Sequence, residues 1–448
     1  MLLPRIRQSS VAGRPPRARL RAAAVAASAA VLVLGPLAAV SSADPAPAPG
    51  PNLPVALAAA VQRDLKISPQ EYLQRADIAQ RLGGFASTAQ SKFPQTFAGA
   101  WMDDAGRPTV ALAPGQGHDE AGKSAQAAGY TVKNVAKTQS ALRDEKSAFQ
   151  QWLSGQPAAV AQAVRGVIVD QVNNTIAVQV QKPGLPMPGF VDPAHVIVMP
   201  AAPAGPPQSD PKVQPVAGAT SNSPRAGGDS YASVAGKTQL VCSSGFNGTD
   251  RAGNVVNITA GHCDPNIPAA GSPNSPGMFE LLPGSHVGAQ LGTFQKSILG
   301  AQDYSIVKIA PAAKDRFANN LVRVPGNAPV AVNGVANPVV GAPVCKSGSR
   351  TGFSCGVVNA VDETVQVGDR NMTQSFSANI CALPGDSGGT IVTGTQALGI
   401  SSASSVADFP ICEIPNLIGA LTGDAPQLFA QPLNKVLADN PGLRVRTN

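Results

Sequence analysis

The stretch that decides the fold of this chain is Gly385-Asp386-Ser387-Gly388-Gly389, with a cysteine six residues before the serine. Glycine lets the backbone turn sharply and lets another chain approach closely. It can also aim successive backbone N–H groups at one point, where they would stabilise a developing oxyanion. Ser387 is therefore a candidate nucleophile, which needs a histidine base and an acid that orients the base.

The histidines limit how Ser387 could be activated. The chain has four, and none follows Ser387. This excludes the α/β-hydrolase elbow, which needs the order serine, acid, histidine. His262 ends an apolar run and precedes Cys263, whose disulfide would fix the backbone beside the imidazole. We expect His262 to be the base; the alternative is a structural histidine at a strand end. The others lie before a Pro-rich segment or in a loop without distinguishing neighbours: His118, His195 and His286.

The orienting acid is expected between His262 and Ser387. Of the eight carboxylates there, only Asp303 opens an alternating apolar strand, which runs to residue 309. An acid that must be buried against an imidazole belongs at such a strand entrance. A triad in the order acid, histidine, serine is compatible with the order of residues if Asp229 or Asp250 is the acid. It would require an α/β pattern, which this half of the chain lacks.

Residues 225–448 alternate short β-rich runs with Gly, Pro, Asn and Ser turns. Many short strands with frequent turns predict an all-β barrel or sandwich. A helix is expected only near the end, over 432–438. The runs are 239–242, 255–259, 304–309, 330–332, 357–361, 390–392 and 397–401.

Residues 56–182 contain no cysteine and have a mixed pattern without an evident catalytic grouping. Helices are expected over 56–65, 69–82 and 140–153, the second capped by Ser68 and ended by Gly83-Gly84. Hairpins are expected over 97–112 and 167–180. Residues 199–224 are rich in Pro, Ala, Gly and Ser and indicate an extended linker that proteases can reach.

The net charge of +7 belongs to the N-terminus. Residues 1–43 carry +6, residues 44–224 carry +1, and residues 225–448 are neutral. No folded domain is basic, so a nucleic-acid partner is not expected. The basic stretch is followed by the apolar run Ala22–Val40 and by Ser41-Ser42-Ala43, the order of a secretory signal. The alternative is an uncleaved anchor near spanning length, which would retain the protein at the membrane or cell wall.

All six cysteines follow residue 241. An even number confined to one half of an exported chain predicts three disulfides, with 15 connectivities left open by the sequence. No Cys-x-x-Cys or paired-histidine spacing favours a metal, and no metal or cofactor is expected. The cysteines are Cys242, Cys263, Cys345, Cys355, Cys381 and Cys412.

Three motifs together resemble those of chymotrypsin-like serine peptidases, above all the secreted bacterial streptogrisin and alpha-lytic type. They are Thr259–Cys263, Asp303–Lys308 and Pro384–Gly389. Further stretches extend the resemblance to most of residues 56–448. They are 225–229, like a mature N-terminus, then 242–247, 345–352 and 431–433, and 56–112, like a pro-region that includes Phe97–Trp101.

The resemblance implies an all-β, chymotrypsin-like double antiparallel β-barrel with a C-terminal helix, preceded by an α+β pro-domain. His262 would act as general base and then acid, Asp303 would orient it, and Ser387 would attack the peptide carbonyl. Backbone N–H groups of Gly385 and Ser387 would hold the oxyanion. The chain would act on peptides or proteins, as a monomer.

The resemblance also implies pairings. The disulfides would be Cys242–Cys263, Cys345–Cys355 and Cys381–Cys412. A basic residue after the first mid-domain cysteine would pair with the acid beside the nucleophile. Here that is Lys346 with Asp386, and Arg350 is the rival.

The chain is therefore expected to have four segments: a signal over 1–43, a pro-region over 44–198, a linker over 199–224 and a protease domain over 225–448. Maturation is expected within 218–226. A double barrel has many non-local contacts and folds slowly, while a secreted protease needs a high unfolding barrier. A removable pro-region that assists folding and inhibits the enzyme meets both needs.

The specificity pocket is expected along 400–405, with Ser402, Ala403 and Ser404 on its wall and Asn379 at its floor. Neutral, small-to-medium side chains should be preferred before the cut. The segment 406–428 is longer than the corresponding segment of the family and could obstruct or extend the pocket. The competing function is a secreted, protease-shaped binding module without activity.

Overall fold

The computed structural model describes residues 53–199, 223–367 and 370–448, all within one compact unit, Pro51–Asn448. The expected signal and nearly all of the expected linker lie outside the described residues. In the described part, no helix is both long enough and apolar enough to cross a lipid bilayer.

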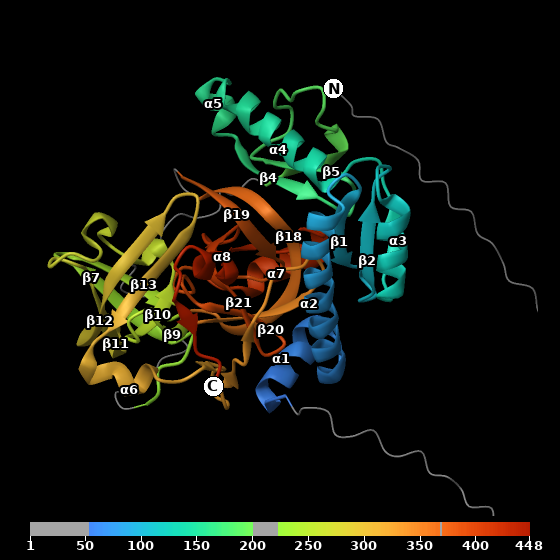
Figure 1. The fold of residues 1–448 in the computed structure, drawn as a ribbon. Helices are drawn as coiled ribbons and strands as arrows, with labels where there is room; N and C mark the ends of the chain where they lie inside the picture. The colour runs from blue at the N-terminus through green and yellow to red at the C-terminus, as the bar shows by residue number, and fades with distance from the viewer. Residues whose placement is uncertain (1–52, 200–222, 368–369) are drawn as a thin grey trace, which may run out of the picture. The chain divides into compact units, whose positions relative to one another are not determined.

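The N-terminal region is α+β, as predicted (Figure 1). Both expected hairpins are present, and a parallel strand extends the first of them. Its helices are α1 (Val55–Leu65), α2 (Pro69–Lys92), α3 (His118–Ala127), α4 (Gln139–Ser154) and α5 (Ala158–Ala161). Its strands are β1 (Phe97–Met102), β2 (Pro108–Leu112), β3 (Thr131–Asn134), β4 (Val164–Asp170), β5 (Thr175–Val180) and β6 (Val196–Val198).

Helix α2 begins where the sequence predicts, because the Ser68 hydroxyl accepts a hydrogen bond from the N–H of Glu71. The prediction that it ends at Gly83-Gly84 is wrong, since the helix continues to Lys92. A Cβ on Gly83 would lie 3.1 Å from a methyl group of Val339. The glycine therefore serves close packing in a shared core, and this packing overrides its low helix propensity.

The C-terminal region is all-β, as predicted, and its strands form two large sheets (Figure 1). The first has eight strands in the order β23-β9-β10-β13-β12-β11-β7-β8. Its members are β7 (Ser230–Ala235), β8 (Thr238–Ser243), β9 (Phe246–Thr249), β10 (Val255–Thr259), β11 (Gly277–Leu282), β12 (His286–Leu299), β13 (Asp303–Ile309) and β23 (Arg444–Val445).

The second sheet joins C-terminal strands to β4, β5 and β6 of the N-terminal region. Strand β18 pairs with β4 through Thr364 opposite Val167 and Val365 opposite Gly166. The C-terminal members are β16 (Gly334–Val335), β17 (Pro343–Gly348), β18 (Gly352–Val367), β19 (Arg370–Ala378), β20 (Thr390–Thr393), β21 (Gln396–Ser404) and β22 (Leu428–Pro432). A small separate sheet holds β14 (Leu321–Val322) and β15 (Val330–Ala331).

The expected C-terminal helix is present as α8 (Leu433–Ala438). The prediction that it stands alone is wrong, because α6 (Lys314–Phe317) and α7 (Glu413–Thr422) are also helical. Helix α7 has a proline at its third position and an internal glycine, but Ile414, Leu417, Ile418 and Leu421 follow a helical spacing and Gly423 ends the helix in the left-handed region, so the sequence carried a signal for it that the prediction passed over. A disulfide from Cys412 to Cys381 fixes its first turn.

Candidate active site

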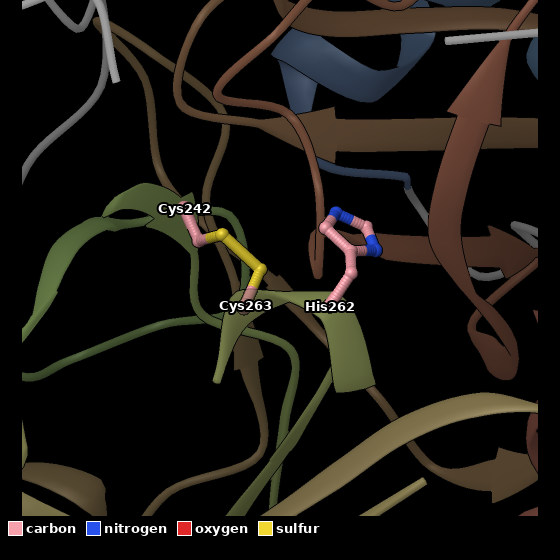
Figure 2. A group of neighbouring side chains, drawn as sticks. All are labelled: Cys242, His262 and Cys263. Atoms are coloured by element: carbon pink, nitrogen blue, oxygen red, sulfur yellow. A yellow bond between two sulfur atoms is a disulfide. The ribbon is translucent and has the colours of Figure 1, made fainter. Parts of the chain in front are cut away.

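His262 lies in a single 3-10 turn, Gly261–Cys263, directly after β10. The neighbouring Cys263 is bonded to Cys242 of β8, which fixes the backbone on one side of the imidazole (Figure 2). A Cβ on Gly261 would lie 1.8 Å from the carbonyl oxygen of Ile298, so only glycine fits before the histidine. The two sulfurs and His262 lie close together, but disulfide sulfurs are not the thiolates that bind metals.

Asp303, the first residue of β13, fixes the orientation of His262. Its Oδ2 lies 2.7 Å from His262 Nδ1, and its Oδ1 accepts the His262 backbone N–H at 2.9 Å. Both side chains are almost completely buried. Two further contacts hold the acid: the Ser402 hydroxyl donates to Oδ2, and the Asp303 N–H donates to Gln431 Oε1.

The ionised form of Asp303 is favoured despite its burial. Burial alone would raise the pKa of Asp303, but the charge of His262 and the hydrogen bonds from His262 and Ser402 outweigh it. The pKa of Asp303 is therefore below its ordinary value. A carboxylate at this position requires His262 Nδ1 to be the donor, which leaves the lone pair of the neutral ring on Nε2. Within the described residues, Nε2 is buried and has no hydrogen-bond partner.

The loop that carries Ser387 packs against the end of β10. The Ser387 carbonyl accepts the Ser243 N–H at 2.8 Å, and Cys263 Sγ lies 3.7 Å from the same oxygen. Gly388 has a φ of +83°, and a Cβ there would lie 2.0 Å from Thr259 Oγ1. Glycine at this position is what lets the serine loop reach the strand that leads to His262.

Two backbone donors in the serine loop are uncommitted. Among the described residues, the N–H groups of Gly385 and Ser387 donate no hydrogen bond, whereas those of Asp386, Gly388 and Gly389 each donate to a carbonyl. Gly385 has a φ of +106°, which an L side chain rarely adopts. The loop conformation therefore leaves free the two donors that the sequence singles out.

Asp386 holds this loop in place through hydrogen bonds and an ion pair. It accepts the backbone N–H groups of Arg350 and Thr351 and the Thr351 hydroxyl, and Lys346 Nζ lies 3.3 Å from its Oδ2. The ion pair is completely buried. The basic partner is thus Lys346, while the Arg350 guanidinium donates to the carbonyl of Pro410.

A small cavity of about 20 Å³ adjoins Ser387. Ser402, Ala403 and Ser404 line it, as expected, and Ala407 brings in the long segment after β21. The structure does not bring Asn379 to this cavity. Asn379 is exposed directly after β19, its Oδ1 accepts the Val357 N–H at 2.6 Å and its own N–H donates to the Val357 carbonyl, so it extends the contact of β19 with β18 by one residue.

The sequence did not reveal that Ser402 and Gln431 contact Asp303. Ser402 lies in a run of serines that suited a pocket wall equally well, and Gln431 stands only at the start of a terminal helix motif. No local signal distinguishes either residue, because both contacts join β13 to strands about 100 residues or more away along the chain.

Three disulfides are present: Cys242–Cys263, Cys345–Cys355 and Cys381–Cys412. They are the pairs that the family resemblance implied. The first fixes the histidine turn, the second joins β17 to β18, and the third joins the segment before the serine loop to α7.

The arrangement of histidine and aspartate on one β-sheet and serine before a strand of a second is that of the chymotrypsin fold, the fold of a large class of serine proteases. Comparison with known proteins narrows the class. No family model matches the chain. Serine protease 2 of Streptomyces fradiae is 35% identical over 182 residues, which span 40% of this chain and 94% of that protein.

Two relatives from Streptomyces griseus also match. Glutamyl endopeptidase 2 is 33% identical over 197 residues, 44% of this chain and 89% of that protein. Streptogrisin-C is 28% identical over 388 residues, 84% of this chain and 75% of that protein, so its match includes the N-terminal region. The chain belongs to the streptogrisin and alpha-lytic type of bacterial serine proteases.

Proposed function

We propose that this chain is a secreted serine endopeptidase, made as a zymogen, in which His262, Asp303 and Ser387 form the catalytic triad. One observation carries the proposal: His262 is held through Nδ1 by a buried carboxylate, its Nε2 has no partner among the described residues, and the neighbouring Cys263 contacts the carbonyl of Ser387. This is the arrangement that a general base for a serine hydroxyl needs.

The reaction runs through an acyl-enzyme. Ser387 Oγ attacks the peptide carbonyl carbon as its proton passes to His262 Nε2, and Asp303 stabilises the imidazolium. The N–H groups of Gly385 and Ser387 hold the oxyanion, and loss of one such donor costs about 3 kcal/mol in comparable sites. His262 then protonates the leaving amine. Water attacks the ester through the same base, which releases the acid and restores Ser387.

The cavity beside Ser387 supports a preference for neutral, small side chains. Among the described residues that line it, the only charged one is Asp386, whose carboxylate is already paired with Lys346. This lining therefore offers no free carboxylate to a lysine or arginine side chain. The same described lining holds no histidine, lysine or arginine, in contrast to what a glutamyl endopeptidase would need for its acidic side chain.

The N-terminal region is proposed as a pro-region over 44–198 that assists folding and then inhibits. Its support is the shared sheet of β4 with β18. We propose that maturation occurs within 218–226; burial of Arg225 and Ala226, and the hydrogen bond from the Arg225 N–H to the carbonyl of Arg316, favour a cut on the N-terminal side of Arg225. Export by a signal over 1–43 agrees with the three disulfides.

The proposal is tested by purifying the secreted chain and its Ser387→Ala variant. The wild-type chain should mature on its own and cleave peptides after neutral residues, and the variant should do neither. Maturation of the variant would show that processing is not autocatalytic. Vigorous cleavage after lysine or arginine would refute the proposed preference. A processed wild-type protein that cleaves no peptide would favour the binding-module alternative.

A further inference from the structure

A buried carboxylate outside the triad lies where the N-terminal region meets the β18–β19 hairpin. Glu363 of β18 is fully buried, and in the described part of the chain neither of its carboxylate oxygens has a partner with good hydrogen-bond geometry, although the Ser377 and Gln179 side chains lie close enough to stabilise its charge in part. Desolvating such a group without a partner is costly when it is charged and far less costly when it is neutral. The triad mechanism does not use this residue.

A β-bulge turns Glu363 inward. The pairing of β18 with β19 shifts between Ala360, opposite Ser377, and Glu363, opposite Ser375. Asp362, between them, has a φ of +51°, in the left-handed region. Asp362 points to Arg143 of α4, with which it forms an ion pair at 2.5 Å, and the next side chain enters the interior.

The N-terminal region covers the bulge through three polar contacts from α4. Besides the Arg143 ion pair, Lys146 Nζ donates to the Asp362 carbonyl, and Gln150 donates to the Thr364 hydroxyl at 3.1 Å. Strand β4 approaches just as closely, because a Cβ on Gly166 would lie 2.8 Å from the carbonyl oxygen of Thr364 (Figure 1 shows β4 beside the hairpin).

The charged side chains around Glu363 do not form an ion pair with it. Asp362 is matched by Arg143, and the Lys146 ammonium is directed to a carbonyl rather than to the Glu363 carboxylate. Strands β5 and β19 contribute only the uncharged side chains Gln179 and Ser377 near the carboxylate.

We propose that Glu363 is a proton-operated latch between the protease domain and its pro-region: its protonated form holds the two together, and its ionisation favours their separation. The inference rests on the proposed role of the N-terminal region as a pro-region. The segment that the latch holds is the chain's own α4 with β4, and the proton controls the contact.

The direction of the effect follows from linkage. Burial raises the pKa of Glu363 to about 7, an effect that Ser377, Lys146 and Gln179 only partly offset. In the separated domain the side chain loses its cover and returns toward the ordinary value of about 4.3. The protonated contact is therefore fully present below the ordinary pKa and is lost as the pH rises through about 7.

The size of the effect is about tenfold in affinity for each pH unit between these two values, or some 10² to 10³-fold in all. Lys146 acts in the opposite sense. Burial lowers the pKa of Lys146, so loss of its proton favours the covered state.

The test uses the full-length Ser387→Ala chain, cut once in the linker by an added peptidase so that both parts remain as a complex. Their dissociation constant is measured by sedimentation from about pH 5 to about pH 9. We expect it to rise about tenfold per pH unit up to about pH 7 and then to level off. In a Glu363→Gln version it should stay near the low-pH value throughout. The matched control is Asp424→Asn, an exposed carboxylate, which should leave the profile unchanged.

A flat profile in the parent complex, or the same slope with Glu363→Gln, would overturn the latch. Lys146→Met on the other side of the contact provides a second readout if the glutamine variant does not fold. Removing that positive charge should move the midpoint to higher pH, and an unmoved midpoint would count against the latch. Because Ser387 is already alanine, the result does not depend on whether the wild-type chain is a protease.

Discussion

At the scale of single residues, the state of Asp303 decides what His262 can do. Its carboxylate receives Nδ1–H and the backbone N–H of His262 together with the Ser402 hydroxyl. These contacts select one tautomer and one ring orientation, in which Nε2 is the basic nitrogen. Asp303 and Ser402 should therefore differ in how much activity their loss removes.

Asp303→Asn should lower kcat by about 10⁴-fold with little change in KM, because an amide imposes the wrong imidazole tautomer. Ser402→Ala removes only one hydrogen bond to a charged acceptor, worth about 1.5–3 kcal/mol, and should lower kcat by about 10- to 100-fold. Steady-state kinetics on one peptide substrate measures both. Equal losses in the two variants would contradict the assignment of Ser402 as a positioning residue.

Gly388→Ala should abolish activity, because its Cβ would collide with Thr259 Oγ1 and displace Ser387. A matched control separates this collision from backbone strain. Gly253 has a φ of +80° and no atom within 4 Å of a Cβ, so Gly253→Ala should cost only about 1–2 kcal/mol of stability and keep its activity. Peptide hydrolysis and urea unfolding of both variants test this, and an active Gly388→Ala protein would be the contrary result.

The sequence singles out a residue where a local motif surrounds it, and it carries no signal where only a contact in the fold decides the position. The string around Ser387 and the strand that begins at Asp303 marked positions that the structure brings to one site. Asn379 was expected at the pocket floor, but its side chain accepts the N–H of Val357 in the middle of β18 instead. A side chain just after a strand can turn to either side, and the sequence around Asn379 carries no signal for which.

At the scale of elements, α1 packs into the hydrophobic core of the C-terminal region. Leu57 and Val61 are fully buried in one cluster with the disulfide Cys345–Cys355 and Leu433 of α8. Asp64 at the end of α1 accepts the Cys355 backbone N–H at 2.8 Å. The helix thus covers apolar surface that belongs to the protease domain.

Leu57→Ala should destabilise the full-length Ser387→Ala chain by about 2–5 kcal/mol, since it removes a completely buried side chain. Val55→Ala in the same helix is the control, because Val55 is 83% exposed and its truncation should change stability by less than about 0.5 kcal/mol. Urea unfolding compares them. Similar effects of the two changes would show that α1 is not packed on the core.

The elements show what local sequence can and cannot specify. Strands bounded by turn residues and helices with a capping serine were predictable. The continuation of α2 past two glycines accompanies a tertiary contact with Val339, whereas α7 has a helical apolar spacing at 414, 417, 418 and 421 that its internal proline and glycine obscured. The pairing of β4 with β18 joins residues about 200 positions apart, which no short motif encodes.

At the scale of the whole molecule, two sheets bring the triad candidates together, and a third group of strands extends one of them. His262 and Asp303 come from the eight-stranded sheet, and Ser387 lies just before β20 of the ten-stranded sheet. The N-terminal strands extend the latter sheet through its β18–β19 hairpin. Folding support and inhibition would therefore act on the same half of the protease domain that carries the nucleophile.

The central claim is that Ser387 is a nucleophile activated by His262. The most direct measurement is fluorophosphonate labelling of the processed wild-type protein, followed by mass spectrometry of its peptides. One adduct is predicted, on Ser387, and it should disappear in the His262→Ala protein. A processed protein with an intact triad that takes up no label, or that carries the label on another serine, would contradict the claim.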